Sequence, residues 1–266
     1  MIARLALALA AGAACLCAGL AQAQSGKSHL QRVLESGTLR VGTTGDFRPM
    51  SVRDPAAGGY VGYDVEAAND LAKSMGVKVE FVPADWKTLV TGVAADKYDI
   101  VMSGVSLNMD RARTAAFTSP YVEFGTVPVV QKAKLAGIRG WGDLDKPEIT
   151  VATTLGTVFD AQAREYFKSA KVRAVEAPAI GFQEVLAGRA DATVTSNVEA
   201  AALVRTYPQL AIVPTDQPRN RRPGAYLVAQ DDIVWLNYVN TWIALKKTEG
   251  FFDALEAKWL RAPQTP

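Results

Sequence analysis

The feature that most limits how this sequence can fold is an alternation of strand-like and helix-like segments that runs through it twice. The first series opens with the strand-like run "LRVGTTG" at 39–45, followed by the helical stretch "GYDVEAANDLAKSMG" at 62–76. That stretch has acids in its first turn and a glycine at its end, as helix termini prefer. The second series opens with "PEITVATTLG" at 147–156. Such alternation favours parallel sheets with helices on both faces, so the sequence predicts two α/β lobes of similar plan.

Further elements follow in each series. In the first we expect strands over 77–84 and 99–104 and a helix over 86–98. In the second we expect strands over 172–177 and 191–196 and helices over 157–170, 181–190 and 197–207. Amphipathic helices over 230–250 and 251–260 close the chain. Ligands of such sheets bind beyond the carboxyl ends of the strands, which makes candidate site turns of 43–48, 103–111, 153–158 and 195–199.

The first 23 residues are predicted to be an export signal rather than part of the fold. One early cation, Arg4, precedes an apolar run, and the pattern Ala21-Gln22-Ala23 predicts cleavage after Ala23. The remaining 266 − 23 = 243 residues contain no apolar run approaching the roughly 18 residues that a membrane helix needs. We therefore expect a soluble periplasmic protein.

The residue types that this chain lacks exclude several kinds of chemistry. Cys15 and Cys17, both inside the predicted signal, are its only cysteines, and His29 is its only histidine. The exported chain then has no disulfide, no cysteine metal site and no parts for a Ser-His-Asp or Cys-His mechanism, so we expect neither a metal nor another cofactor. A formal net charge of +2 without a basic tract argues against a nucleic-acid partner.

The turns and their flanking segments resemble a known family. The segments that carry the resemblance are "LRVGTTGDFRPMS", "GYVGYDVEAANDLA", "DIVMSGVSLNMDRARTAAFTSPY", "GTVFDAQAREYF" and "VLAGRADATVTSNVEA". Through them the exported chain resembles the extracellular solute-binding proteins of family 3, the polar-amino-acid receptors of ABC importers. The resemblance implies the type II periplasmic-binding-protein fold, in which two hinge strands join two α/β lobes that close on a ligand. We expect lobe 1 over 24–128 and 224–266 and lobe 2 over 129–223, with crossings near 127–132 and 218–228.

The resemblance places a ligand carboxylate at Arg111, which follows "SGVSLNMD". A guanidinium suits a planar carboxylate because two parallel N–H bonds fit it. Judged by its local pattern alone, Arg111 could equally be a solvent-exposed helix residue. Ser106 would offer a hydroxyl and Gly104 a backbone N–H to the same ligand. The Gly156-Thr157 turn opens a predicted helix, where anions are stabilised, and would contact the same carboxylate.

Two aromatic residues are candidates for the walls of the site. In the family an aromatic at the position of Phe47 lies over the ligand, and Trp86 lines the same wall. Both bury large faces, so either could equally belong to an ordinary core. We interpret Asp46, beside Phe47, as a structural acceptor of hydrogen bonds in the first turn.

Two positions depart from the patterns of related proteins. The family's amino-acid receptors commonly hold the α-ammonium with an Asp where this chain has Ser196, which favours a ligand without an amine or one bound in another pose. The segments "TTGDF-P-S-R" and "MSG-S-N---R-R" also resemble a small enzyme branch, the periplasmic cyclohexadienyl dehydratases. That branch carries a substrate-facing Lys after the glycine of "PY---G", where this chain has Thr126. Arg48 or Arg53 could replace that cation, but no sequence feature shows that either does.

Glu199 corresponds to the catalytic acid of the dehydratase branch, which protonates a leaving hydroxyl while loss of a carboxylate aromatises the ring. It follows Ser196 by three positions at the start of a predicted helix, so the two residues share a face. A carboxyl shielded between lobes could have a pKa high enough for this role. A ligand contact and a solvated helix residue are the other interpretations of Glu199.

We therefore expect a periplasmic solute-binding protein that captures a small carboxylate or amino-acid-like ligand between its lobes for an ABC importer. The alternative is a dehydratase that acts on prephenate or arogenate with Glu199 as general acid. The sequence does not identify the ligand, because ligand choice depends on the shape of the pocket.

Overall fold

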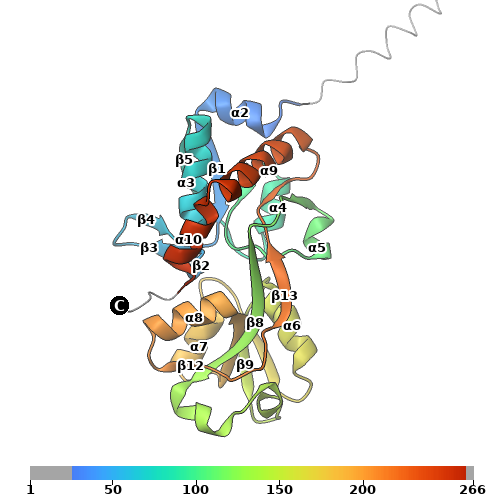
Figure 1. Ribbon diagram of the computed structural model, residues 1–266. Helices are drawn as coiled ribbons and strands as arrows, with labels where there is room; N and C mark the ends of the chain where they lie inside the picture. Colours follow the sequence, from blue (N-terminus) through green and yellow to red (C-terminus); the bar gives the residue numbers. More distant parts are fainter. Residues whose placement is uncertain (1–25, 262–266) are drawn as a thin grey trace, which may run out of the picture.

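The computed structural model describes residues 26–261, which form two lobes, one above the other in Figure 1. The predicted signal peptide at 1–23 and its cleavage site lie outside the described residues. Within 26–261 no helix has the length and apolar character needed to cross a membrane.

Lobe 1 is built on a five-stranded sheet of order β5-β1-β6-β14-β7. Strand β1 runs parallel to both β5 and β6, whereas β14 runs antiparallel to β6 and β7. The strands are β1 (Thr38–Thr43), β5 (Lys78–Pro83), β6 (Ile100–Val101), β7 (Ala115–Phe117) and β14 (Leu227–Ala229). A small antiparallel sheet of β2 (Asp46–Phe47), β3 (Ser51–Asp54) and β4 (Gly59–Val61) extends from it. The helices are α2 (His29–Ser36), α3 (Tyr63–Met75), α4 (Leu89–Ala94), α5 (Met109–Ala112), α9 (Ile233–Thr248) and α10 (Phe251–Trp259).

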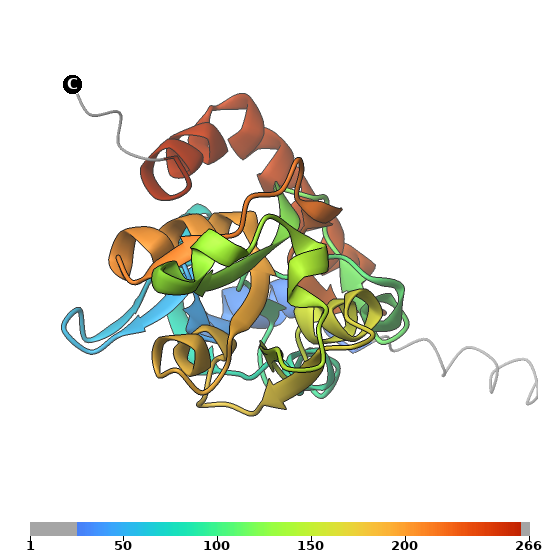
Figure 2. The same ribbon diagram turned by 90° about the horizontal axis from the view of Figure 1, so that it is seen from below.

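Lobe 2 has the sheet order β10-β9-β11-β8-β12, with β13 also paired to β8. Its strands are β8 (Val122–Gln131), β9 (Thr150–Thr154), β10 (Lys171–Val175), β11 (Ala192–Ser196), β12 (Leu210–Ile212) and β13 (Arg219–Gly224). Its helices are α6 (Val158–Tyr166), α7 (Gly181–Leu186) and α8 (Asn197–Thr206), and the short 3-10 helices η1 (Lys132–Gly137) and η2 (Trp141–Leu144) follow β8. Helices α6 and α8 lie on opposite flanks of this lobe in both views (Figure 1, Figure 2).

Two long antiparallel strands, β8 and β13, connect the lobes side by side (Figure 1). Both overlap the segments predicted to cross, near 127–132 and 218–228, although β8 begins earlier, at Val122. The predicted lobe limits at 128/129 and 223/224 stay a prediction. Because two strands join the lobes within residues 26–261 and each lobe has hydrophobic clusters of its own, hinge motion between the lobes is the expected large-scale movement.

The alternation in the sequence predicted β1, β5, β6, β9, β10, β11 and the larger helices, but not the strands that make both sheets mixed rather than parallel, which are β7, β8, β12, β13 and β14. The crossings near β8 and β13 were expected only from the family resemblance. The helix predicted over 86–98 is confined to α4, because Asp85 accepts hydrogen bonds from the backbone N–H groups of Lys87 and Thr88 and makes a turn there. Helix α2 and the sheet of β2, β3 and β4 were not predicted. The three strands have only two to four residues each, too few for a clear alternating pattern, whereas α2 has Leu30, Val33 and Leu34 at helical spacing, a signal that the sequence analysis did not use.

Candidate ligand-binding site

The two lobes contact each other across a cleft formed by the turns that follow their strands. The Nη2 of Arg111 in lobe 1 lies 3.1 Å from the carbonyl oxygen of Gly156 in lobe 2. Farther along the cleft, Lys87 Nζ lies 3.3 Å from Glu176 Oε1. The cleft is therefore closed, and the predicted site turns of both lobes meet in it.

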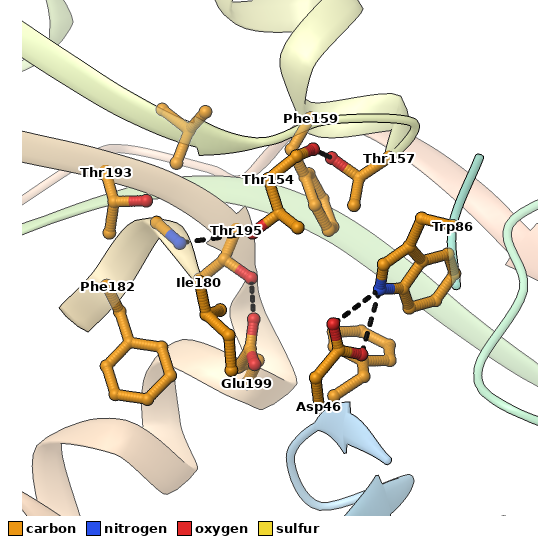
Figure 3. Close-up of a pocket in the computed structure, with 13 residues that line it drawn as sticks. Asp46, Trp86, Thr154, Thr157, Phe159, Ile180, Phe182, Thr193, Thr195 and Glu199 are labelled. Carbon is orange, nitrogen blue, oxygen red and sulfur yellow. Dashed lines mark hydrogen bonds between the residues drawn. The ribbon is translucent and has the colours of Figure 1, made fainter. Parts of the chain in front are cut away.

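A cavity of about 30 Å³ lies within the closed cleft (Figure 3). Lobe 1 contributes Asp46, Phe47 and Trp86 to its lining, and lobe 2 contributes Thr154, Thr157, Phe159, Ile180, Gly181, Phe182, Thr193, Val194, Thr195 and Glu199. One water needs on the order of 10–15 Å³ measured in this way, so the cavity holds two or so waters and no amino acid. An organic ligand therefore requires the lobes to part.

An open groove of about 600 Å³ adjoins the cavity. Trp86 and Thr157 line both spaces and so stand at the boundary between them. The polar and charged residues of the groove are Lys87, Asn108, Asp110, Arg111, Thr157, Asp160, Gln162, Glu165 and Arg222. A ligand that spans cavity and groove would pass between Trp86 and Thr157.

Arg111 places a buried cation in this cleft. It belongs to the single turn α5, whose cap Asn108 accepts a hydrogen bond from the Arg111 backbone N–H at 2.8 Å. Its guanidinium donates to the carbonyls of Ser106 at 3.3 Å and Gly156 at 3.1 Å, and it lies 5.8 Å from the centre of the Trp86 ring. Within residues 26–261 no carboxylate forms an ion pair with it. Burial lowers the pKa of Arg111 to about 10, so it remains a cation at neutral pH.

Glu199 places a buried carboxyl on the opposite lobe, in the first turn of α8. The hydroxyl of Thr195 donates to its Oε2, and Oε1 has no hydrogen-bond partner among the described residues. Burial, reinforced by the negative charge of Asp46, raises the pKa of Glu199 to about 8, although the hydrogen bond from Thr195 and the proximity of Arg48 oppose the rise. At neutral pH the Glu199 carboxyl is therefore mostly protonated. It is not a solvated helix residue.

Asp46 lies across the cavity from Glu199, on the lobe 1 wall (Figure 3). Its Oδ1 and Oδ2 accept from the indole N–H of Trp86 at 2.9 Å and 3.1 Å. Burial raises the pKa of Asp46, opposed by hydrogen bonds from Thr44 and Trp86. Asp46 therefore does more than the predicted structural role requires. It orients the Trp86 ring, and its own carboxylate faces the cavity.

Aromatic rings from both lobes and from a connecting strand meet at Phe47. Its ring packs edge to face on Trp86 with centres 5.8 Å apart, and it lies 5.7 Å from Phe124 of β8 and 6.4 Å from Phe159 of lobe 2. Phe47 and Trp86 both line the cavity. Contact of either ring with a ligand stays a prediction.

Gly104 and Ser106 are buried beneath the site and line neither space. The Gly104 N–H donates to the buried Asp64 carboxylate, so it is not free for a ligand. Ser106 forms a β-bridge with Gly224 and supports Arg111 through its carbonyl. In this closed structure both residues support neighbouring side chains and have no surface in the cavity or the groove.

Ser196 and Thr126 pair with each other in the β11–β8 ladder, and they too line neither space. The Ser196 hydroxyl accepts from the backbone N–H of Glu199 at 3.0 Å and caps α8. The Thr126 hydroxyl donates to Gln162 Oε1 at 2.6 Å. Ser196 thus positions the helix turn that carries Glu199, and Thr126 supplies no charge in place of a lysine.

Several lining residues were missed by the sequence analysis. Thr193 and Thr195 alternate along β11, a pattern that could have signalled one polar face of that strand. Thr154 accepts a hydrogen bond from the Gly181 N–H at 3.1 Å, which brings the start of α7 to the cavity. Ile180 and Phe182 gave no local signal, because only the packing of α7 on β9 and β11 brings them there.

Two lobes that close over a buried guanidinium and a buried carboxyl define a two-lobed ligand-binding protein. The chain belongs to the bacterial extracellular solute-binding proteins, family 3, whose family model matches residues 39–262. It is 35% identical over 240 residues to the cyclohexadienyl dehydratase of Pseudomonas aeruginosa, covering 90% of this chain and 89% of that protein. The predicted family and fold class are confirmed.

Solved structures agree with this assignment. The ancestral amino acid-binding protein AncCDT-1, a precursor of cyclohexadienyl dehydratase, matches with a TM-score of 0.81 and 37% identity over 88% of this chain and 100% of that one. A putative binding component of an ABC transporter from Wolinella succinogenes, complexed with lysine, matches with a TM-score of 0.79 and 32% identity over 86% and 97% of the two chains. The chain therefore has similarity both to amino-acid receptors and to the dehydratase branch.

The raised pKa of Glu199 predicts a specific pH dependence of stability. A carboxyl with a pKa near 4.5 in the unfolded chain and about 8 in the folded protein contributes its full stability below pH 4.5. That contribution declines as the pH rises to about 8. Glu199→Gln cannot ionise and should escape the decline, so the variant should be more stable than the wild type at pH 8.5 by up to roughly 4 kcal/mol. Urea unfolding at pH 5 and 8.5 measures the difference, and parallel pH curves for the two proteins would refute it.

Gly156 should control closure of the lobes. A Cβ built on Gly156 would lie 2.7 Å from the backbone atoms Lys87 N and Trp86 C, which belong to the other lobe and can retreat only if the cleft opens. Gly156→Ala should therefore scatter X-rays with a larger radius of gyration than the wild type. Gly188→Ala is the control, because Gly188 has a similar positive φ of 71° and no close neighbour. Equal radii for Gly156→Ala and the wild type would contradict the contact.

Proposed function

We propose that this protein is a periplasmic receptor that captures an amino acid with its carboxylate on Arg111 and a positively charged group between Asp46 and Glu199. The observation that carries the proposal is the buried guanidinium of Arg111, which is compensated only by carbonyl oxygens and one aromatic face. Removing a charge from water is costly unless a counter-charge is supplied, and an entering carboxylate supplies it. Arg111 belongs to lobe 1 and contacts lobe 2, so the same anion would also favour closure.

The positive end of the ligand is inferred from the two acids of the cavity. Asp46 and Glu199 face each other from different lobes, and the negative charge of Asp46 contributes to the raised pKa of Glu199. An ammonium or guanidinium group between them would relieve that repulsion and draw the proton off Glu199. These acids offer a partner for a cation although Ser196 replaces the Asp that family receptors commonly use. The lysine bound to the Wolinella structure supports the same ligand class.

Family membership supports the remaining parts of the proposal. Relatives include binding components of ABC transporters, so delivery to an importer in the membrane is the expected outcome of capture. Export to the periplasm rests on the predicted signal at 1–23 together with the extracellular character of the family.

Calorimetry with L-arginine, L-lysine, L-glutamine and benzoate tests the ligand class and the role of Arg111. The two cationic amino acids should bind most tightly. Arg111→Ala should weaken their binding by at least 30-fold, since breaking a buried charge pair costs about 2–5 kcal/mol. Arg111→Lys should also lose much of the affinity, because it cannot fork onto a carboxylate.

Arg113→Ala is the matched control for these variants. Arg113 lies two residues from Arg111, its side chain is 78% exposed, and it pairs only with Asp110 on the surface. Its loss should leave binding unchanged. Wild-type affinity in Arg111→Ala would show that Arg111 does not bind the ligand. Tight binding of benzoate alone would show that the ligand needs no positively charged group.

A dehydratase is the second candidate function, and the protonated Glu199 carboxyl favours it. In that reaction Glu199 would donate its proton to the ring hydroxyl of a cyclohexadienyl substrate, which leaves as water. The ring carboxylate would leave as CO₂, and the electron pair of the broken C–C bond would complete the aromatic ring. A carboxylic acid that stays protonated near neutral pH suits this step.

The surroundings of Thr126 count against the dehydratase. Prephenate carries two carboxylates, and Arg111 is the one buried cation that lines the cavity or the groove within residues 26–261. Thr126, at the position of the branch's lysine, is neutral and is hydrogen-bonded to Gln162. The remaining cations of the groove, Lys87 and Arg222, are not buried. We therefore place binding first.

Prephenate turnover distinguishes the two candidates. A receptor should produce no phenylpyruvate above the spontaneous rate measured at the same pH, in the wild type and in Glu199→Gln alike. Phenylpyruvate formation that depends on the wild-type protein and falls about 100-fold in Glu199→Gln would establish the dehydratase instead. Thermal shifts of both proteins with prephenate show whether any loss reflects binding rather than proton donation.

A further inference from the structure

A second buried carboxyl, Asp64, lies in lobe 1 behind the ligand-binding site. It stands in the first turn of α3 and is completely buried. Its Oδ2 accepts two hydrogen bonds, from the backbone N–H of Gly104 and from the Tyr121 hydroxyl at 2.8 Å. Within residues 26–261 no cation forms an ion pair with Asp64. A buried acid without a cationic partner is costly, so its place in the fold calls for a specific role.

The first of these bonds fixes the aromatic wall of the ligand cavity. Gly104 has a φ of +63°, and a Cβ on it would lie 2.5 Å from the Phe47 ring, so the 104 backbone packs directly against that ring. The helix that carries Asp64 is also tied to the turn after Phe47, because the Asp64 N–H donates to the Met50 carbonyl at 2.9 Å. The position of Phe47 therefore depends on contacts that converge on Asp64.

The second bond fixes the lobe 1 ends of both connecting strands. Tyr121 immediately precedes β8, and Tyr226 follows two residues after the end of β13. Their rings stack with centres 4.2 Å apart, and the Tyr121 N–H donates to the Gly224 carbonyl at 3.0 Å. The Asp64 bond to the Tyr121 hydroxyl thus holds the point from which both strands leave for lobe 2.

We propose that Asp64 is a positioning residue that joins the aromatic wall of the ligand site to the roots of both connecting strands, so that ligand affinity and hinge position are set together. One carboxylate oxygen serves both partners, and the link from Phe47 through Gly104, Asp64 and Tyr121 is a continuous series of contacts. The proposal rests on the function proposed above, since it assumes that the cleft closes on a ligand. Burial raises the pKa of Asp64 to about 7, and its neutral form keeps the same acceptor oxygen.

Two substitutions separate the bonds of Asp64 from its charge. Asp64→Asn retains one oxygen that can accept from both Gly104 and Tyr121, whereas Asp64→Leu keeps the branched arrangement of four side-chain heavy atoms, is larger, and accepts nothing. Leu71→Ala is the structural control, because Leu71 is fully buried on the same helix and lines neither the cavity nor the groove. Leu71→Ala should lower the melting temperature without changing the distance between the lobes.

The measurement is the distance between spin labels on the two lobes, with L-arginine binding as a second readout. Labels at Lys97→Cys and Lys168→Cys are unique, because the chain after residue 23 has no cysteine and both side chains are exposed. Asp64→Leu should broaden the distance distribution and weaken L-arginine binding at least tenfold. Asp64→Asn should keep the wild-type distribution and an affinity within threefold of the wild type.

The possible outcomes separate this proposal from the proposed function. A folded Asp64→Leu with the wild-type distance distribution and affinity would overturn the role proposed for Asp64. An equal change of distances and affinity in Leu71→Ala would overturn it too. If Asp64→Leu does not fold, Tyr121→Phe removes one bond only, and an unchanged distance distribution in that variant would overturn the proposal as well. If L-arginine does not bind the wild type, the ligand class fails, while the distances measured without ligand still test Asp64.

Discussion

The buried guanidinium of Arg111 is the interaction on which the closed structure depends. It bonds the carbonyl of Ser106 in its own lobe and that of Gly156 in the other, so one cation spans the cleft with two neutral acceptors. Carbonyl dipoles only partly replace the hydration that burial removes, as its lowered pKa shows. In our account, an anion bound beside Arg111 would stabilise the closed cleft. Ligand binding and lobe closure would therefore be thermodynamically coupled.

Asp46 and Glu199, the two acids of the cavity, determine which charged group the ligand needs besides its carboxylate. Glu199 and Asp46 are held in place by neutral neighbours, Thr195 and Trp86, and neither has a cation bonded to it within residues 26–261. A buried acid in this setting either keeps a proton or takes a positive ligand group. The same geometry therefore suits a receptor for cationic amino acids and lies close to that of an acid catalyst. The relatives of this chain include both kinds of protein, and the single buried cation of the cleft within residues 26–261 is our reason for placing the receptor first.

The sequence predicted the architecture better than the contacts of the site. Most of the parallel strands are followed by a turn and a helix, and this local pattern was enough to predict the parallel part of each sheet and the four turns that meet in the cleft. The antiparallel strands lack this pattern and were not predicted from it. The burial of Arg111 depends on Gly156, 45 residues away on the other lobe, and no local pattern encodes that contact. For the same reason the capping role of Ser196 and the pairing of Thr126 with Gln162 were not predicted. Short polar side chains form such bonds wherever the fold presents a partner.

The central claim concerns the orientation of a ligand, and a crystal structure of the protein grown with L-arginine tests it most directly. Our account predicts that the ligand carboxylate forks onto Arg111 beside the Gly156-Thr157 turn. It also predicts that the side-chain guanidinium or the α-ammonium lies between Asp46 and Glu199, with Trp86 along its length. A bound L-arginine with its carboxylate away from Arg111, or with no positive group near either acid, would contradict the account.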